Sequence, residues 1–208
     1  MVRKGLLSLL LVSVLAGGIS PAQATSLRHQ NLVDLIGLSE SILTGKVVTL
    51  TDGFQEGVPY TEVTVSVDEA IRGEPGHRYT FRQFGLMAPR DLGDGRTYVG
   101  VTPDGVPRFT VGDDVLLFLY KKGSLTGFRT TVGLDQGAFK KKGDLYENGF
   151  QNLDLMSGVR VKPSLLTPAE LKLLKEKQGP IQADVLLGLV RKAVHERWVE
   201  TGRLSHVR

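Results

Sequence analysis

Two adjacent carboxylates, Asp113 and Asp114, stand directly before an unbroken apolar run in the stretch PRFTVGDDVLLFLY, residues 107–120. Paired carboxylates can perform acid–base chemistry when their environments separate their pKa values, and carboxylates can also bind metal ions. However, Gly112 and Asp113 form a turn signal at the mouth of a predicted strand. We therefore predict that both acids are solvated turn residues.

The other chemistry-bearing motifs lack the spacing of known sites. Asp91, Asp94 and Asp104 lie among glycines, but the regular spacing of a calcium loop and its closing glutamate are missing. The four histidines show no H-E-x-x-H spacing, and the residues around Ser39 lack the second glycine of a nucleophile elbow. The sequence thus predicts no catalytic residue, no metal site and no cofactor. A hydrolase with a scattered triad stays open as a less favoured alternative.

Two uncharged residues are candidates for ligand or partner contacts. Gln136 in GLDQGAF either satisfies backbone groups at a strand end or contacts a ligand. Tyr79 could belong to an aromatic platform that stacks on bases or sugars. Strand alternation places Tyr79 and Phe81 on one face, and this pattern favours a place in the core.

The N-terminus has the features of a secretory signal peptide. Arg3 and Lys4 precede an apolar core at residues 6–15, and small residues end at Ala24. This core is shorter than the roughly 20 residues that span a bilayer. We therefore expect cleavage after Ala24 and a soluble periplasmic or secreted protein with no membrane span.

Charge and cysteine content narrow the partners. Removing the signal lowers the formal net charge from +4 to +2, and the only basic cluster is Lys140, Lys141 and Lys142. A nucleic-acid binder should carry a larger basic stripe, so no nucleic-acid partner is expected. The three lysines form either a solvated hairpin tip or a contact for a polyanion. Because the chain has no cysteine, burial alone must stabilise it.

The hydrophobic pattern predicts short strands followed by helices. We expect a short helix within residues 30–37, with Asn31 as its cap and Gly37 just after its end, and Thr167 begins a helix with capping-box spacing. Gly45 marks a bulge in a strand that begins near Ile42. The other expected elements are strands at 60–71, 115–120 and 128–134, a hairpin around 142–144, a helix from 183 or 184 to about 200, and a frayed tail at 201–208.

The strand at 115–120 is apolar on both faces, which indicates burial on both sides. It requires a sheet core on one side and a cover on the other, and the C-terminal helices are the natural cover. This pattern predicts a mainly β fold, a small barrel or sandwich, with a short N-terminal helix and a C-terminal two-helix cap. The expected division is a signal peptide at 1–24, a barrel domain at 25–160 and a helical segment at 161–208.

Four segments, SESILTGKVV, YTEVTVSVDEAIRGEP, PRFTVGDDVLLFLY and VGLDQGAF, together resemble a group of largely uncharacterised exported bacterial proteins. The likeness covers residues 32–140. The order of elements is also similar to the closed or partly open oligonucleotide/oligosaccharide-binding (OB) barrel of tissue inhibitors of metalloproteinases. Those inhibitors chelate zinc through an N-terminal cysteine, whereas this chain is expected to begin at Thr25 and has no cysteine. Their mechanism is therefore not carried over, and a protease-regulating role stays open by analogy alone.

These expectations describe an exported, non-enzymatic binding protein whose partner is another exported protein. The alternative is an oligosaccharide- or polyanion-binding module that uses Tyr79 and the basic hairpin.

Overall fold

The computed structural model describes residues 28–207. The predicted signal peptide and its cleavage site at Ala24 lie outside the described residues. Within residues 28–207, no helix has both the length and the hydropathy to cross a membrane.

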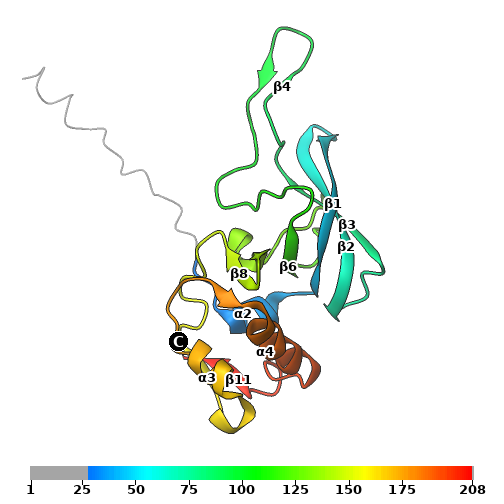
Figure 1. Ribbon diagram of the computed structural model, residues 1–208. Helices are drawn as coiled ribbons and strands as arrows, with labels where there is room; N and C mark the ends of the chain where they lie inside the picture. Colours follow the sequence, from blue (N-terminus) through cyan, green and yellow to red (C-terminus); the bar gives the residue numbers. More distant parts are fainter. Residues whose placement is uncertain (1–27, 208) are drawn as a thin grey trace, which may run out of the picture.

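Seven strands form one antiparallel sheet in the order β10-β8-β7-β6-β1-β2-β3 (Figure 1). Its strands are β1 (Ser41–Gln55), β2 (Val58–Arg72), β3 (Arg78–Phe84), β6 (Asp114–Leu119), β7 (Ala138–Lys142), β8 (Leu145–Asn148) and β10 (Ile181–Gln182). Two small sheets pair β4 (Arg90–Asp91) with β5 (Thr97–Tyr98), and β9 (Val159–Val161) with β11 (Leu204–His206). The helices are α2 (Leu32–Leu38), α3 (Pro168–Leu173) and α4 (Ala183–His195), with short 3-10 turns η1 (Leu134–Gly137) and η2 (Pro163–Leu165). The mainly β prediction is confirmed.

Strand β6 is buried on both faces, as predicted. On one face Val115, Leu117 and Leu119 join the sheet cluster, whose other buried members come from β1, β2, β3 and β7: Leu43, Val47, Val63, Val65, Phe81 and Ala138. On the other face Leu116 and Phe118 join the helical cluster. Its members from the three α-helices include Leu32, Leu35 and Ile36 of α2, Leu173 of α3, and Leu186, Leu189, Val190 and Ala193 of α4. Because the sheet cluster is built from strands of one sheet, that sheet curves around it.

The sheet does not close into a barrel, because β10 and β3 remain its edges. The predicted strand at 128–134 is reduced to a single bridge between Thr131 and Leu119. The backbone of this segment still bonds to two strands. Thr131 bridges to Leu119 of β6, and the Arg129 N–H donates to the Arg82 carbonyl of β3 at 2.8 Å. The ladder ends there because Gly133 and Leu134 have φ angles of 63° and 59° and turn the chain into η1.

Gly45 lies at a bulge in β1, as predicted. The pairing of β1 with β2 shifts register between Thr44 and Gly45. A Cβ atom at position 45 would lie 2.2 Å from the Ser66 carbonyl oxygen and 2.7 Å from Cγ1 of Val65. The bend in β1 therefore depends on a residue without a side chain.

The β1–β2 hairpin is longer than the sequence pattern predicts. The glycines, proline and acids of TDGFQEGVP, residues 51–59, predict a turn-rich loop, but most of these residues belong to the paired strands. Only Glu56 and Gly57 form the turn, with φ angles of 52° and 79°. Two consecutive positive φ angles match the twist of a two-residue hairpin, which extends both strands beyond the predicted ends.

The predicted helix caps are confirmed where the signal is local. The Asn31 side chain accepts the amide hydrogens of Val33 and Asp34 at 3.0 and 3.1 Å. Thr167 and Glu170 form both bonds of a capping box. Gly37, expected just beyond the first helix, instead lies inside α2, whose last turn is closed by Ser39.

The C-terminal region is more ordered than predicted. Helix α4 ends at His195 instead of near residue 200, and Arg197 follows with a φ of 54°. Trp198 then turns into the helical cluster and is only 1% exposed. The tail predicted to fray instead forms β11 against β9, with Leu204 fully buried. Residues 161–208 therefore contain strands as well as helices.

Glu170 links α3 to α4 through a partly buried ion pair. It is 3% exposed, and its carboxylate lies 2.6 Å from Nζ of Lys192. Although burial pushes the Glu170 pKa upward, the hydrogen bonds from Lys192 and the Thr167 backbone hold the pKa below the ordinary value. A depressed folded-state pKa stabilises the protein above the ordinary glutamate pKa, and that contribution is lost as the pH falls through the folded-state pKa.

We expect Glu170→Gln to lower the free energy of unfolding by about 1–2 kcal/mol at pH 7, because the charged hydrogen bonds are lost. The difference from wild type should shrink as the pH falls below the ordinary glutamate pKa and through the lower folded-state pKa. Urea denaturation at several pH values measures it, with the exposed Glu74→Gln as control. A difference that does not change with pH would contradict the depressed pKa.

Candidate functional site

Asp113 and Asp114 do not form an acid–base pair. Asp113 binds Nζ of Lys140 at 2.7 Å and accepts the Thr110 amide hydrogen at 2.8 Å. Asp114 binds Nζ of Lys46 at 2.8 Å. Each acid is thus neutralised by its own lysine. This pairing is consistent with Asp113 in a charged turn and Asp114 at the start of β6.

The acids of the connection at 85–106 serve local turns. Asp91 accepts the Gly93 amide hydrogen, and Asp94 accepts hydrogen bonds from Arg96. The exposed Asp104 lies 3.8 Å from Arg108. Across residues 28–207, no three histidine, aspartate or glutamate side chains come together as potential metal ligands.

Gln136 satisfies backbone groups, which is the structural alternative considered for it. Its Oε1 accepts the Gln30 amide hydrogen at 2.7 Å, and its Nε2 donates to the carbonyls of Arg28 and Gly133 at 3.1 and 3.2 Å. The side chain is buried. Gln136 therefore holds residues 28–30 against η1.

Tyr79 and the basic hairpin lie in different hollows. Tyr79 packs beside Phe81 and under the Arg129 guanidinium, 5.7 Å from the ring centre. Lys140 lines a separate groove and donates to the Arg108 carbonyl at 2.7 Å. Lys141 and Lys142 are exposed beside the hairpin turn between β7 and β8. The structure does not bring these candidates into one site.

Asp135 is a residue that the sequence analysis missed. It lines the same groove as Lys140, where burial raises the pKa of its carboxyl and the charges of Lys140 and Arg108 partly offset that rise. The groove balances three cations against three anions: Arg108, Lys140, Lys142, Asp104, Asp135 and Glu147. This balance gives little attraction for a polyanion.

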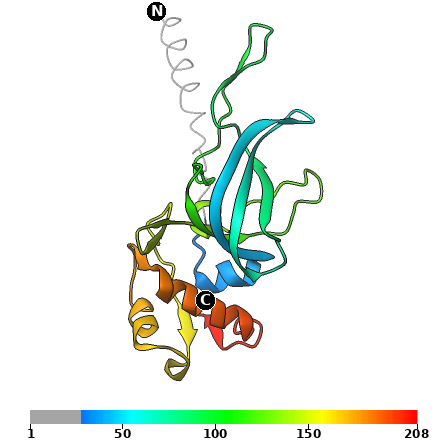
Figure 2. The ribbon, with the colours of Figure 1, turned by 45° about the vertical axis from the view of Figure 1, so that its right-hand side comes forward.

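An arm formed by residues 85–106 projects from the sheet (Figures 1 and 2). It contains the small β4–β5 hairpin and lies at the end of the molecule opposite α3 and α4. The far end of β1 anchors it: Asp52 accepts the Met87 amide hydrogen at 2.8 Å and pairs with Arg90. The rings of Phe54 and Tyr98 also meet edge to face, 5.2 Å apart.

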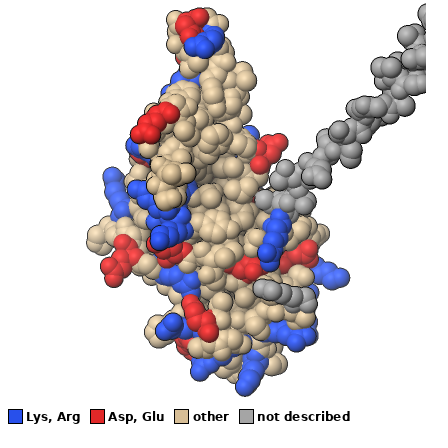
Figure 3. Space-filling model, turned by 180° about the vertical axis from the view of Figure 1, so that it is seen from behind, with Lys and Arg blue, Asp and Glu red and all other residues tan. Residues whose placement is uncertain are grey.

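The arm exposes apolar side chains and pairs several of its charges. Leu92 and Val99 are 44% and 72% exposed. At the tip, Nε of Arg96 donates to Asp94 at 2.8 Å, while Arg90 is paired with Asp52. Figure 3 shows the arm as a mostly uncharged surface with charged side chains near its tip. Leu92 and Val99 are therefore apolar side chains on the arm that contact with another protein would remove from water.

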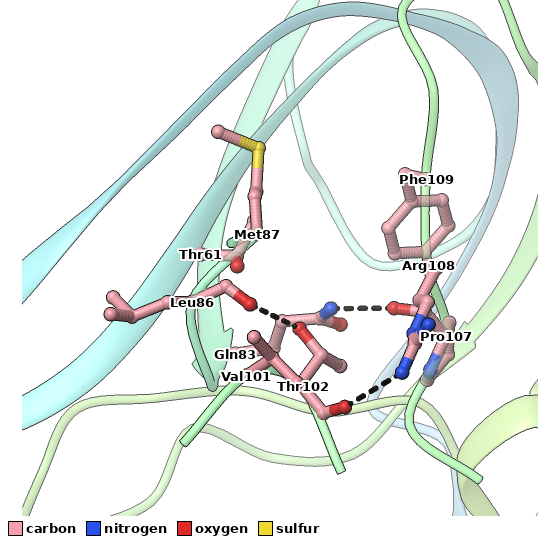
Figure 4. A pocket seen from close by; sticks show the side chains of 9 residues that line it. All are labelled: Thr61, Gln83, Leu86, Met87, Val101, Thr102, Pro107, Arg108 and Phe109. Carbon is pink, nitrogen blue, oxygen red and sulfur yellow. Dashed lines mark hydrogen bonds between the residues drawn. The ribbon is translucent and has the colours of Figure 1, made fainter. Parts of the chain in front are cut away.

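A pocket of about 350 Å³ lies at the base of the arm (Figure 4). Its lining comes from the two ends of the arm, from β2 and β3, and from the segment that leads toward β6: Thr61, Gln83, Leu86, Met87, Val101, Thr102, Pro107, Arg108 and Phe109. Gly85 permits the tight crossing there, because a Cβ atom on it would lie 2.5 Å from Cα of Thr102.

Gln83 is the distinctive polar group of this pocket. It is 2% exposed, and its Nε2 donates to the Pro107 carbonyl at 2.6 Å. Its Oε1 is buried and accepts no hydrogen bond from the described residues. Gln83 continues the inward register of Tyr79 and Phe81, which is the signal that would have identified it from the sequence.

Comparison with protein-family models, curated proteins and solved structures gives no significant match to this chain.

Proposed function

We propose that this chain is an exported, non-enzymatic binding protein that docks another exported protein through the arm at residues 85–106. The observation that carries the proposal is the exposure of Leu92 and Val99 on a projecting arm with a paired charged tip. Burying such side chains in a partner contributes favourably because apolar surface leaves water. The anchoring of the arm by Asp52 reduces the ordering cost of binding.

The non-enzymatic part of the proposal is supported by how the acids are used. Asp113 and Asp114 are each neutralised by a separate lysine, and Asp94 is paired with Arg96. Charges committed to structural pairs leave little basis for acid–base chemistry at these positions.

We also infer that the fold is a partly open OB-like barrel with a helical cap. Strand β1 pairs with both β2 and β6, and backbone bonds connect the segment at 128–132 to β6 and to β3. These five segments follow one another around the sheet cluster, in keeping with a five-stranded barrel. The helical cluster on the other face of β6 supports the cap.

A double variant of the arm, Leu92→Ser with Val99→Ser, tests the binding function. We expect it to weaken partner binding by at least about tenfold, because it removes two apolar anchors from the interface. The purified protein is used to capture partners from the periplasmic and secreted fractions, and binding of the recovered partner is then measured by titration.

The matched control is Leu125→Ser, which changes a leucine that is 97% exposed in another loop. A partner that binds wild type and the control but not the arm variant supports the proposal. Equal binding by all three proteins would overturn it. Light scattering tests one further case. If wild type is a dimer and the arm variant is a monomer, the partner is a second copy of this chain instead of another exported protein.

A further inference from the structure

We propose that the pocket at the base of the arm binds a carboxylate ligand that carries an apolar group and an N–H donor, as in an N-acylated apolar amino acid. The same chemistry occurs at the C-terminal residue of a protein. This site is distinct from the docking surface proposed above, because it uses Gln83 and Arg108 instead of Leu92 and Val99.

The buried Gln83 amide leaves one acceptor that a donor on the ligand would satisfy. Its orientation is fixed, since Nε2 donates to the Pro107 carbonyl at 2.6 Å and a flipped amide would bring two oxygen acceptors together. In Figure 4 the amide lies between the arm base and the segment at 107–109. Oε1 is therefore left as a buried acceptor at the pocket, a group that gains most from meeting an N–H or O–H donor.

The walls of the pocket favour an apolar group on the ligand. Five of the nine lining residues are apolar: Leu86, Met87, Val101, Pro107 and Phe109. Phe109 is held in place by the sheet cluster, where its ring meets that of Phe81 edge to face at 6.1 Å. A volume of about 350 Å³ lies at the small end of the range for ligand sites, so the ligand fills it with one short side chain.

Arg108 supplies a cation at the rim. One of its nitrogens donates to the Thr102 carbonyl at 3.1 Å, and this bond holds the side chain against the arm base. The side chain is otherwise exposed, and Asp104, its nearest acid, lies 3.8 Å away and is fully exposed. Because a guanidinium has five N–H groups, several remain for a carboxylate.

The two remaining polar side chains of the pocket, Thr61 and Thr102, already donate their hydroxyl hydrogens to backbone carbonyls. The Thr61 hydroxyl donates to the Gly85 carbonyl at 2.8 Å, and the Thr102 hydroxyl donates to the Leu86 carbonyl at 3.1 Å. An unsatisfied acceptor, apolar walls and a cation at the rim thus act together, and they match an N-acyl amino acid with its N–H, side chain and carboxylate.

The direct test is titration of the purified protein with N-acetyl-leucine, followed by backbone amide shifts and calorimetry. We expect saturable binding with shifts centred on Gln83, Arg108 and Phe109. N-acetyl-leucine amide and N-acetyl-N-methyl-leucine should each bind about tenfold more weakly, because the first lacks the carboxylate and the second the N–H donor. The absence of binding up to about 10 mM would overturn the proposal.

Two variants separate the contacts. Arg108→Gln is expected to cost about tenfold in affinity for N-acetyl-leucine and to leave affinity for its amide unchanged, whereas Arg96→Gln at the arm tip should bind as wild type. Gln83→Leu should abolish the preference for the N–H donor. Since it also removes the bond to Pro107, its thermal stability is checked alongside. Unchanged affinity in both pocket variants would contradict the site.

Peptides identify the source of the ligand. A peptide ending in leucine with a free carboxylate is compared with its C-terminal amide and with N-acetyl-leucine. If the free-acid peptide binds more tightly than N-acetyl-leucine, the pocket is assigned to a protein C-terminus. If the two bind equally, it is assigned to a free acyl amino acid. Both outcomes support the site. The Leu92→Ser/Val99→Ser variant should retain this ligand even if it loses the protein partner.

Discussion

Replacing Trp198 with alanine should lower the free energy of unfolding by about 3–5 kcal/mol, the usual cost of truncating a buried aromatic ring. Trp198 is 1% exposed and belongs to the cluster that joins α4 to β6. The centre of its ring also lies 5.8 Å from Nζ of Lys192, and its Nε1 donates to the Glu196 carboxylate at 2.9 Å. The loss is measured by urea denaturation followed by far-ultraviolet circular dichroism, because the variant has no tryptophan to report by fluorescence.

Two comparisons make this result interpretable. Trp198→Phe retains most of the apolar surface, so its loss should be clearly smaller than that of the alanine variant. Leu125→Ala changes a fully solvated side chain and should alter stability by no more than about 0.5 kcal/mol. A loss below about 1 kcal/mol for Trp198→Ala would show that the ring is not an integral part of the core.

The second large effect is expected at the bulge of β1. Gly45→Ala places a methyl group 2.2 Å from the Ser66 carbonyl, so β1 and β2 must separate or the bulge must shift. We expect a loss of about 3 kcal/mol, at the upper end of the range for overpacked interiors. Thermal unfolding should show a midpoint lower by several degrees.

Gly188→Ala is the matched control, because it makes the same change inside α4. A Cβ atom there meets only Oε1 of Glu170 at an ordinary 3.6 Å. Alanine should therefore raise stability by about 0.5–1 kcal/mol through helix propensity. Equal effects at the two positions would mean that the close approach at Gly45 does not limit the structure.

Local signals in the sequence predicted local structure well. The apolar run that begins at Val115 identified a strand buried on both faces, and Asn31 and Thr167 identified the starts of two helices. The predictions failed where distant pairing decides the outcome. Leu204 is buried because β11 finds β9, a pairing that no property of the tail itself indicates.

The candidate site was harder to predict for the same reason. The sequence marks Gln136 as a distinctive polar residue, but only the position of residues 28–30 shows which backbone groups it satisfies. The pocket requires both ends of the arm to return to β3, and Gln83 and Arg108 come from separate segments. Alternation along β3 could have placed Gln83 inward, whereas nothing in the sequence pattern places Arg108 beside it.

The two faces of β6 also decide how the molecule can be divided. Strand β6 contributes Leu117 to the sheet cluster and Phe118 to the helical cluster. Removing either cluster would therefore expose one face of a strand that also supports the other cluster. The helices cannot be exchanged as a module without rebuilding the interior of the protein. The arm, whose two ends cross at Gly85 and Thr102, is the segment that evolution or a protein engineer can replace while both clusters stay intact.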